Sequence, residues 1–300
     1  MMKITEFPAL PDEIKEASNK EKLAIFIGAG VSRFLGCESW ATLAYNLTTR
    51  CEKEGLINHL EQQSLSNLTD FKKTITICHE ILKDKESAFM DEMQKSLNDS
   101  EVSKDNFDLE IYKDLFSFNG LFVTTNADRH IDQLFIKDNI VKDLKDFYSD
   151  NVSKYKLYKI HGCITDKESL VFTVDRYIEQ YLNKNFSDFL QKIFNEYTVL
   201  FVGYGLGEIE LLDYIFKSKS GGSGHFMLKD YFKHEEKIYR FEQLYFDKLG
   251  IKIIPYEKDQ NGFNQLKDII KNWADKIKIE TVTMQKVFED IDDALENPNE

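Results

Sequence analysis

The chain has 300 residues, 42% of them hydrophobic, which is enough to bury the core of one large domain or two small ones. Its 52 acidic and 39 basic residues give a net charge of −13, which argues against a broad basic face for nucleic acid. No apolar run reaches the roughly 18 residues of a membrane span, and residues 1–6 lack the features of a secretory signal. We therefore expect a cytoplasmic protein that binds neither a membrane nor, directly, nucleic acid.

The cysteines stand apart in the sequence, as Cys37, Cys51, Cys78 and Cys163. None forms a C-x-x-C pair, and neither they nor the histidines have the spacing of metal ligands. Isolated thiols in a chain without a signal indicate a reducing cytoplasm, where most of them would serve as small core residues. The sequence therefore predicts no metal.

The first part of the chain combines one strand with many helices. Residues 1–22 predict a short helical lead-in, and the five consecutive apolar residues 23–27 predict a strand buried on both faces. Apolar residues at helical spacing follow over 40–47. Residues 56–118 are polar and helical in character, and we expect a helical insertion that serves packing, a lid or an oligomer contact.

Strands and helices alternate in the rest of the chain. Strands are predicted over 121–125, 155–160, 170–172, 198–202, 225–228 and 251–254. Helices are predicted after Asp128 with Ile131, Leu134 and Phe135 on one face, from Asp175 as the cap through Tyr197, over 208–216, over 234–249 before Gly250, and through Ile269, Ile270 and Trp273. Residues 217–224 have the composition of a flexible loop, and residues 283–300 are acidic.

This alternation predicts an α/β fold, a Rossmann-like parallel sheet with helices on both faces and a helical insertion or subdomain. We expect three segments. They are an N-terminal helical lead-in over 1–22, a main domain over 23–275 that includes the insertion at 56–118, and an acidic C-terminal segment over 276–300.

Glycines and polar residues follow four of the predicted strands. They are Gly28, Ala29, Gly30 and Ser32 after the first, Asn126 and Asp128 after the second, His161 after the third, and Gly203, Tyr204 and Gly205 after the fourth. In an open α/β sheet, ligands bind beyond the carboxyl ends of the strands. A strand that runs through glycines into a helix also lets the backbone approach a phosphate. We therefore expect one ligand crevice at this edge.

Each of these residues also has a purely structural interpretation. The first glycine turn can be a tight connection without a ligand, and Asn126 or Asp128 can cap the next helix. His161 can be a loop histidine without a task. Gly203 and Gly205 can serve close packing alone.

Four motifs stand in the order found in sirtuin-like domains. They are Gly-Ala-Gly-Val-Ser at 28–32, Thr-Thr-Asn-Ala-Asp at 124–128, Ile-His-Gly at 160–162 and Gly-Tyr-Gly-Leu-Gly-Glu at 203–208. Over roughly residues 20–260 the chain resembles the bacterial sirtuin-like (SIR2-type) NAD-hydrolysing domains of anti-phage defence proteins. The resemblance implies a Rossmann-like domain that binds NAD and cleaves it to nicotinamide and ADP-ribose, so that NAD is depleted in abortive infection.

Under this hypothesis the site residues have distinct tasks. The pyrophosphate would be bound by Gly28, Ala29, Gly30 and Ser32, and the adenosine side would lie against Gly203, Tyr204 and Gly205. Asn126 would orient the nicotinamide ribose or the attacking water, and Asp128 would hold Asn126 or the carboxamide. His161 would be the general base.

Other functions remain open at this point. A sirtuin-type protein deacylase is one, although the chain lacks the two C-x-x-C pairs of the usual zinc module. A module that senses NAD or ADP-ribose without turnover is another. A dehydrogenase ranks last, because Arg33 stands where the dinucleotide fingerprint has its third glycine.

An enzyme that destroys NAD must be kept inactive in a healthy cell, and the sequence contains no dedicated sensor domain. We therefore expect a homo-oligomer, or control by a partner protein of a defence system such as a translocase ATPase or an Argonaute-like protein.

Overall fold

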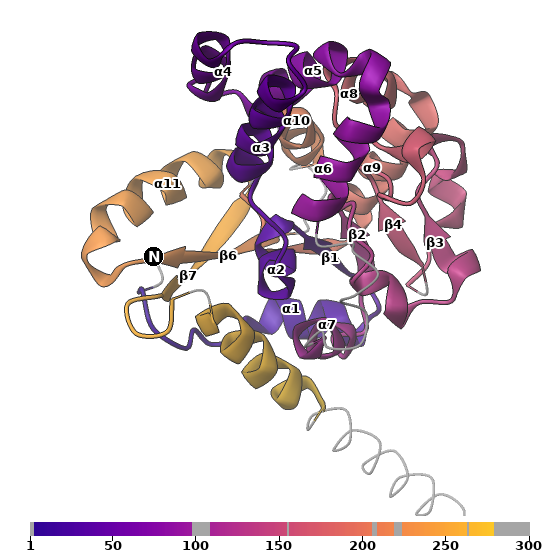
Figure 1. Ribbon diagram of the computed structural model, residues 1–300. Helices are drawn as coiled ribbons and strands as arrows, with labels where there is room; N and C mark the ends of the chain where they lie inside the picture. The colour runs from indigo at the N-terminus through magenta and orange to yellow at the C-terminus, as the bar shows by residue number, and fades with distance from the viewer. Residues whose placement is uncertain are drawn as a thin grey trace, which may run out of the picture.

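The computed structural model describes residues 3–97, 109–154, 156–205, 209–218, 224–262 and 264–278. In this part of the chain, seven parallel strands form one sheet in the order β3-β4-β2-β1-β5-β6-β7 (Figure 1). The strands are β1 (Leu23–Ile27), β2 (Leu121–Thr124), β3 (Ile140–Val141), β4 (Leu157–Lys159), β5 (Thr198–Val202), β6 (His225–Tyr231) and β7 (Ile251–Glu257). The predicted α/β Rossmann-like fold is confirmed.

Strand β1 lies at the centre of the sheet and is buried along its whole length, as its apolar sequence predicts. Side chains alternate between the two faces of a strand. Leu23, Ile25 and Ile27 accordingly belong to one hydrophobic cluster, and Ala24 and Phe26 belong to another. The central strand therefore contributes to the core on both sides of the sheet.

Helices cover both faces of the sheet. Apolar side chains of α1 (Asp12–Asn19), α7 (Glu110–Phe116) and the helix over residues 264–278 fill the cluster on one face. The opposite cluster takes its side chains from α9 (Lys184–Glu196), α10 (Ile209–Ser218) and α11 (Glu236–Leu249). Each helix presents an apolar stripe to the sheet, which explains the helical spacing of the apolar residues in the sequence.

A third hydrophobic cluster lies beside the carboxyl ends of the strands. Helices α3 (Trp40–Lys53), α5 (Phe71–Ile81) and α6 (Glu86–Ser96) supply its side chains, and α4 (His59–Ser66) packs beside α3, where Gln62 Nε2 donates to Thr48 Oγ1 at 3.2 Å (Figure 1). Ala127, after β2, and Ile164 and Phe172, after β4, pack into the same cluster. These helices therefore stand over the edge where the ligand crevice is expected.

The two ends of this helical segment meet. The backbone N–H of Glu38 donates to the carbonyl of Ser96 at 2.8 Å, and the Ser96 hydroxyl donates to Glu38 Oε2 at 2.7 Å. The chain leaves the sheet through α2 (Ala29–Ser32), forms α3 to α6, and returns to the place where it left.

In the segment from the end of β2 to residue 172, two predictions are wrong and one strand was not predicted. The segment after Asp128 forms a short 3-10 helix, Ile131–Leu134, in place of the predicted α-helix, and the Asp132 N–H donates to the Arg129 carbonyl at 3.2 Å. Residues 170–172 are not a strand, and the Val171 N–H makes a single bond to the His161 carbonyl just after β4 at 3.2 Å. The short strand β3 was not predicted at all.

The helix predicted from Asp175 through Tyr197 is two helices, α8 (Val174–Leu182) and α9. The N-cap of α8 is Thr173, and Asp175 lies in its first turn, where a carboxylate suits the helix dipole. The backbone of Asn183 is extended, and its side chain accepts from the Phe186 N–H and so begins α9.

The helical character predicted for 56–118 is confirmed where the structure describes it, although α7 packs on the sheet. Residues 217 and 218 belong to α10, and residues 219–223 of the predicted loop lie outside the described residues. So does the acidic stretch 283–300. Within the described ranges, no helix has the length and apolar character needed to cross a membrane.

His225, the first residue of β6, predicts a pH dependence of stability. The ring lies beside Phe194, its Nδ1 accepts from the Val199 N–H at 3.3 Å, and burial lowers its pKa to about 4. The unfolded chain then binds the proton more tightly, so stability is intact above about pH 6.5 and is lost as the pH falls toward 4. We expect His225 to cost about 2 kcal/mol of unfolding free energy between pH 7.5 and pH 5.

Urea unfolding at both pH values tests this expectation. The His225→Asn variant retains an acceptor near the Nδ1 position but cannot titrate, so its loss of stability should be smaller by the same amount. Equal losses in the two proteins would contradict the assignment.

Candidate functional site

A cavity lies at the carboxyl ends of β1 and β2. Four of the predicted site residues line it, namely Ala29, Ser32, Asn126 and Asp128. The remaining lining residues are Cys37, Glu38, Ser39, Trp40, Leu43, Ser96, Leu97, Thr125, Ala127 and Phe172. One wall therefore comes from the strand ends and the opposite wall from the two ends of the α3–α6 segment.

The side chain of Asn126 is held in one orientation. Its Nδ2 donates to the Gly28 carbonyl at 3.0 Å and to Ser32 Oγ at 2.7 Å, and these bonds occupy both amide hydrogens. Its backbone N–H donates to Thr124 Oγ1, which itself donates to the Ile27 carbonyl. The carbonyl oxygen Oδ1 is therefore the atom that Asn126 can offer to a ligand in the cavity.

Ser32 is the centre of the hydrogen-bond network below the cavity. Its Oγ donates to Asp128 Oδ2 at 2.6 Å, accepts from Asn126, and lies 3.2 Å from the Tyr112 hydroxyl. Because the single hydroxyl hydrogen goes to the carboxylate, Tyr112 is the donor in the last bond. Burial, reinforced by the charge of Asp128, raises the pKa of Tyr112 well above its usual value, which keeps this donor protonated. The one donor and the two acceptor positions of the Ser32 hydroxyl are therefore all used by partners within the protein.

Tyr112 belongs to α7 and was not among the predicted site residues. Nothing in the sequence marks this tyrosine as a site residue, because only the packing of α7 against the sheet brings its hydroxyl to Ser32.

The Asp128 carboxylate is fixed from several sides and is 1% exposed. Besides the Ser32 hydroxyl, the backbone N–H of His130 donates to Oδ1 at 3.0 Å. The Lys159 ammonium, which donates to the Asp128 carbonyl, also pairs with Asp132 at 2.7 Å. Burial lowers the pKa of Lys159, but the nearby charges, Asp132 first, outweigh it and leave that pKa raised, so the lysine is a cation at neutral pH.

The two glycine turns pack directly against each other. The Gly28 N–H donates to the Val202 carbonyl at 3.0 Å, and the Gly30 N–H donates to the Gly203 carbonyl at 2.9 Å. A Cβ on Gly28 would lie 2.4 Å from the Gly203 oxygen, and a Cβ on Gly203 would lie 2.6 Å from the Val31 nitrogen. The close approach that these glycines permit is therefore between two parts of the chain.

The rest of the second turn lies outside the cavity lining. The Tyr204 ring packs on Phe201 with the centroids 5.6 Å apart, and a Cβ on Gly205 would meet open space. The structure thus joins this turn to the first one through Gly203, whereas Tyr204 and Gly205 do not reach Asn126.

His161 is fully buried just after β4 and does not line the cavity. Its ring packs edge-on against Tyr177 with the centroids 5.1 Å apart. Its carbonyl accepts from Val171, the residue before the cavity-lining Phe172. The backbone of His161 is thus bonded to the segment before Phe172, whereas its ring packs against Tyr177 and does not line the cavity.

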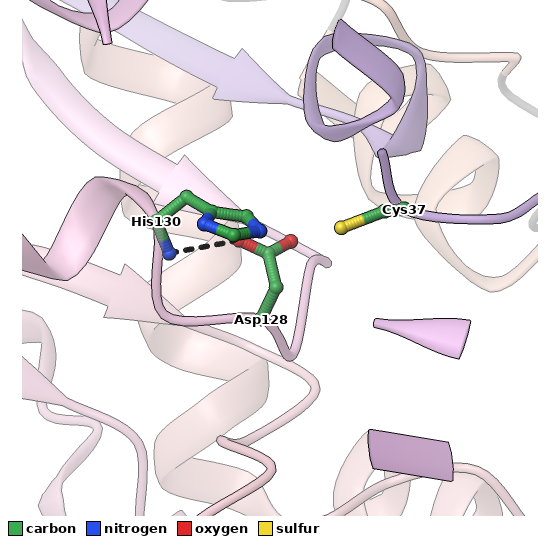
Figure 2. Close-up of side chains that lie close together, drawn as sticks. All are labelled: Cys37, Asp128 and His130. Carbon is green, nitrogen blue, oxygen red and sulfur yellow. Dashed lines mark hydrogen bonds between the residues drawn. The ribbon is translucent and has the colours of Figure 1, made fainter. Parts of the chain in front are cut away.

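The structure also brings together a set of metal-type donors that the sequence does not suggest. Ligand atoms of Cys37, Asp128 and His130 lie within 4.8 Å of one another, and all three residues are buried (Figure 2). Cys37 comes from the loop before α3, and the other two come from the loop after β2. Because Cys37 lies far from Asp128 and His130 in the sequence, the three residues form no short spacing motif that the sequence alone could reveal.

Comparison with known proteins covers three of the four motifs, and the first, at 28–32, lies outside the matched segment. Residues 120–254 match the model of the SIR2-like domain family, a segment from the residue before β2 into β7 that includes Asn126, Asp128, His161 and the Gly203 turn. No curated protein sequence matches the chain. A domain of this family supports an NAD-related activity and is consistent with an NAD-dependent enzyme. Residues 120–254 are therefore similar to SIR2-like domains, and the match supports a SIR2-type domain in this part of the chain.

Proposed function

We propose that this protein is an NAD+ glycohydrolase that cleaves NAD+ to nicotinamide and ADP-ribose. The observation that carries the proposal is the fixed carboxamide of Asn126 in the lining of a strand-end cavity, within a SIR2-type domain.

The chemistry of the cleavage explains why such a residue is useful. Breaking the bond between nicotinamide and ribose passes through a state with positive charge on the sugar, as in other glycoside cleavage. Nicotinamide leaves as a neutral molecule, so no strong general acid is needed. Asn126 Oδ1 can accept a hydrogen bond from a ribose hydroxyl or from the attacking water, and its partial negative charge favours the cationic state.

In this proposal the other residues hold the substrate or hold Asn126. Ala29 and Ser32 lie at the part of the cavity nearest the turn after β1, where the pyrophosphate would bind. The amides of Gly28 and Gly30 are bonded to β5 and its turn, so these glycines keep the turn in place. Asp128 fixes the Ser32 hydroxyl, which in turn fixes Asn126.

His161 is proposed as the general base, and its burial means that the segment between β4 and Phe172 must move to bring its ring to the substrate. A general base contributes about 10²–10⁴-fold to rate, so we expect His161→Gln to lower the rate of NAD+ cleavage by that factor. His59→Gln is the control, because His59 is an exposed residue of α4. Nicotinamide release by the folded variant at the unmutated rate would remove His161 from the mechanism.

The burial of His161 also favours a second function, binding of NAD or ADP-ribose without turnover. One experiment separates the two functions. Purified full-length protein is incubated with NAD+, the products are separated by chromatography, and binding of NAD+ and of ADP-ribose is measured by calorimetry. Release of nicotinamide supports the glycohydrolase. Binding without release supports the sensing module, and absence of both contradicts the two proposals.

The biological part of the proposal is depletion of NAD as a defence against phage, with activity controlled by assembly of copies of this chain or by a partner protein. Its support is the motif resemblance and the need to restrain such an enzyme in a healthy cell. This part is tested by measuring cellular NAD after phage infection in cells that carry the unmutated protein and in cells that carry the Asn126→Ala variant. NAD levels that do not depend on Asn126 would count against it.

A further inference from the structure

We propose that Cys37, Asp128 and His130 form a binding site for a zinc-type divalent cation in the wall of the cavity. Their ligand atoms lie within 4.8 Å of one another (Figure 2). Cys37 and Asp128 also line the cavity, so a cation held there would have an open side toward it. The binding itself does not depend on the proposed NAD+ cleavage.

The donor set fits this class of metal. A thiolate, an imidazole and a carboxylate are the ligands that Zn²⁺ takes in proteins, and sites with three protein ligands leave a fourth position for water or another molecule. Zinc bonds of about 2.0–2.3 Å place neighbouring donor atoms roughly 3.5 Å apart, so donor atoms that lie within 4.8 Å of one another need to close by at most about 1.3 Å.

Cys37 is placed where such an adjustment is local. It follows Gly36, whose φ of +82° ends the 3-10 helix Arg33–Leu35, and it precedes α3. Its thiol donates to the Leu97 carbonyl at 3.2 Å. Metal binding replaces the S–H hydrogen with the cation and releases one proton to solvent, so the affinity must fall as the pH is lowered.

The Asp128 carboxylate is already oriented for a cation. Two neutral donors, the Ser32 hydroxyl and the His130 backbone N–H, bond to its two oxygens and fix its plane. An ionised carboxylate has further lone pairs beyond these two bonds. A divalent cation here would balance the negative charge of this buried carboxylate and that of the thiolate which Cys37 becomes on binding.

The site has a consequence that rests on the proposed function. Asp128 holds Ser32, and Ser32 holds Asn126, so a cation on Asp128 acts on the same network as the substrate. Occupation of the cavity wall by zinc would therefore inhibit NAD+ cleavage in competition with NAD+.

Cobalt is the probe for the binding itself, because a thiolate bound to Co²⁺ absorbs in the near ultraviolet. Reduced full-length protein is titrated with Co²⁺ and then with Zn²⁺. We expect one Co²⁺ per chain, a thiolate-to-cobalt band, visible bands of a tetrahedral ion, and loss of all of them on addition of Zn²⁺. Absence of a thiolate band in the unmutated protein would overturn the proposal.

Variants identify the ligands. Cys37→Ser should abolish the thiolate band, and His130→Ala should weaken Co²⁺ binding by at least about 10-fold. Cys163→Ser is a demanding control, since Cys163 is also buried and its sulfur lies 3.8 Å from a carboxylate oxygen of Asp132. A band that survives Cys37→Ser, or disappears in Cys163→Ser, would overturn the assignment. Because this readout needs no NAD+, its failure and the failure of the glycohydrolase proposal are distinguishable.

Discussion

Replacing Asn126 with alanine is expected to lower the rate of NAD+ cleavage by about 10²–10³-fold, or about 3–4 kcal/mol of barrier. The structure holds this carboxamide with two hydrogen bonds, so its oxygen meets the substrate without reorganisation. A fixed dipole of this kind stabilises developing charge more than mobile water does. The measurement is nicotinamide release under single-turnover conditions, which separates chemistry from product release.

The same substitution also has a structural effect that must be measured separately. It leaves the Gly28 carbonyl and Ser32 Oγ without the Asn126 donor, which costs about 1–3 kcal/mol of unfolding free energy. Urea unfolding shows whether the variant is folded under assay conditions. Asn195→Ala, an exposed change of the same kind on α9, is the control and should retain full activity. A folded Asn126→Ala protein with an unchanged rate would contradict the proposed mechanism.

Gly203→Ala is expected to cost about 3 kcal/mol or more of unfolding free energy. Gly203 has φ of +62°, a conformation that costs other residues about 1–2 kcal/mol. The added Cβ would also lie 2.6 Å from the Val31 nitrogen and 3.0 Å from the Gly30 carbonyl carbon, both of them backbone atoms of the facing turn. The two turns would have to separate, and the cavity side chains that depend on the first turn would move with it.

Gly205→Ala is the matched control, since it lies two residues away in the same motif. Its added Cβ would meet no atom within 4 Å, and we expect a change within about 0.5 kcal/mol. Urea unfolding of the two variants gives the comparison directly. Equal losses of unfolding free energy in the two variants would show that the contact between the two glycine turns does not contribute to stability. A stable Gly205→Ala protein with weaker NAD+ binding would place the ligand at Gly205.

The sequence was sufficient for the features that depend on neighbouring residues. The buried strand β1 follows from five apolar residues in a row, and the end of α11 follows from Gly250, whose φ of +77° is the left-handed C-cap. Because the carboxyl ends of parallel strands lie together, the sequence also predicts that one edge of the sheet gathers Ser32, Asn126 and Asp128.

Features that depend on distant parts of the chain could not be predicted in this way. The glycines of the first turn have a sequence typical of phosphate binding, yet the backbone that approaches them belongs to the Gly203 turn. Tyr112 reaches Ser32 only because α7 packs on the sheet, and Cys37 reaches His130 only because the chain folds back before α3. His161 follows β4 as predicted, but the direction of its ring is set by packing against Tyr177.

The meeting of Glu38 with Ser96 has a consequence for how this architecture can vary. Because Glu38 and Ser96 are bonded to each other, the helices between these residues are attached like a module with adjacent ends. Insertions, deletions or exchange of α4 and α5 need not alter the spacing of β1 and β2, since the loop that they extend is already closed. We therefore expect proteins with the same sheet to differ most between these two residues, and to acquire different partners there while the chemistry at the strand ends stays the same.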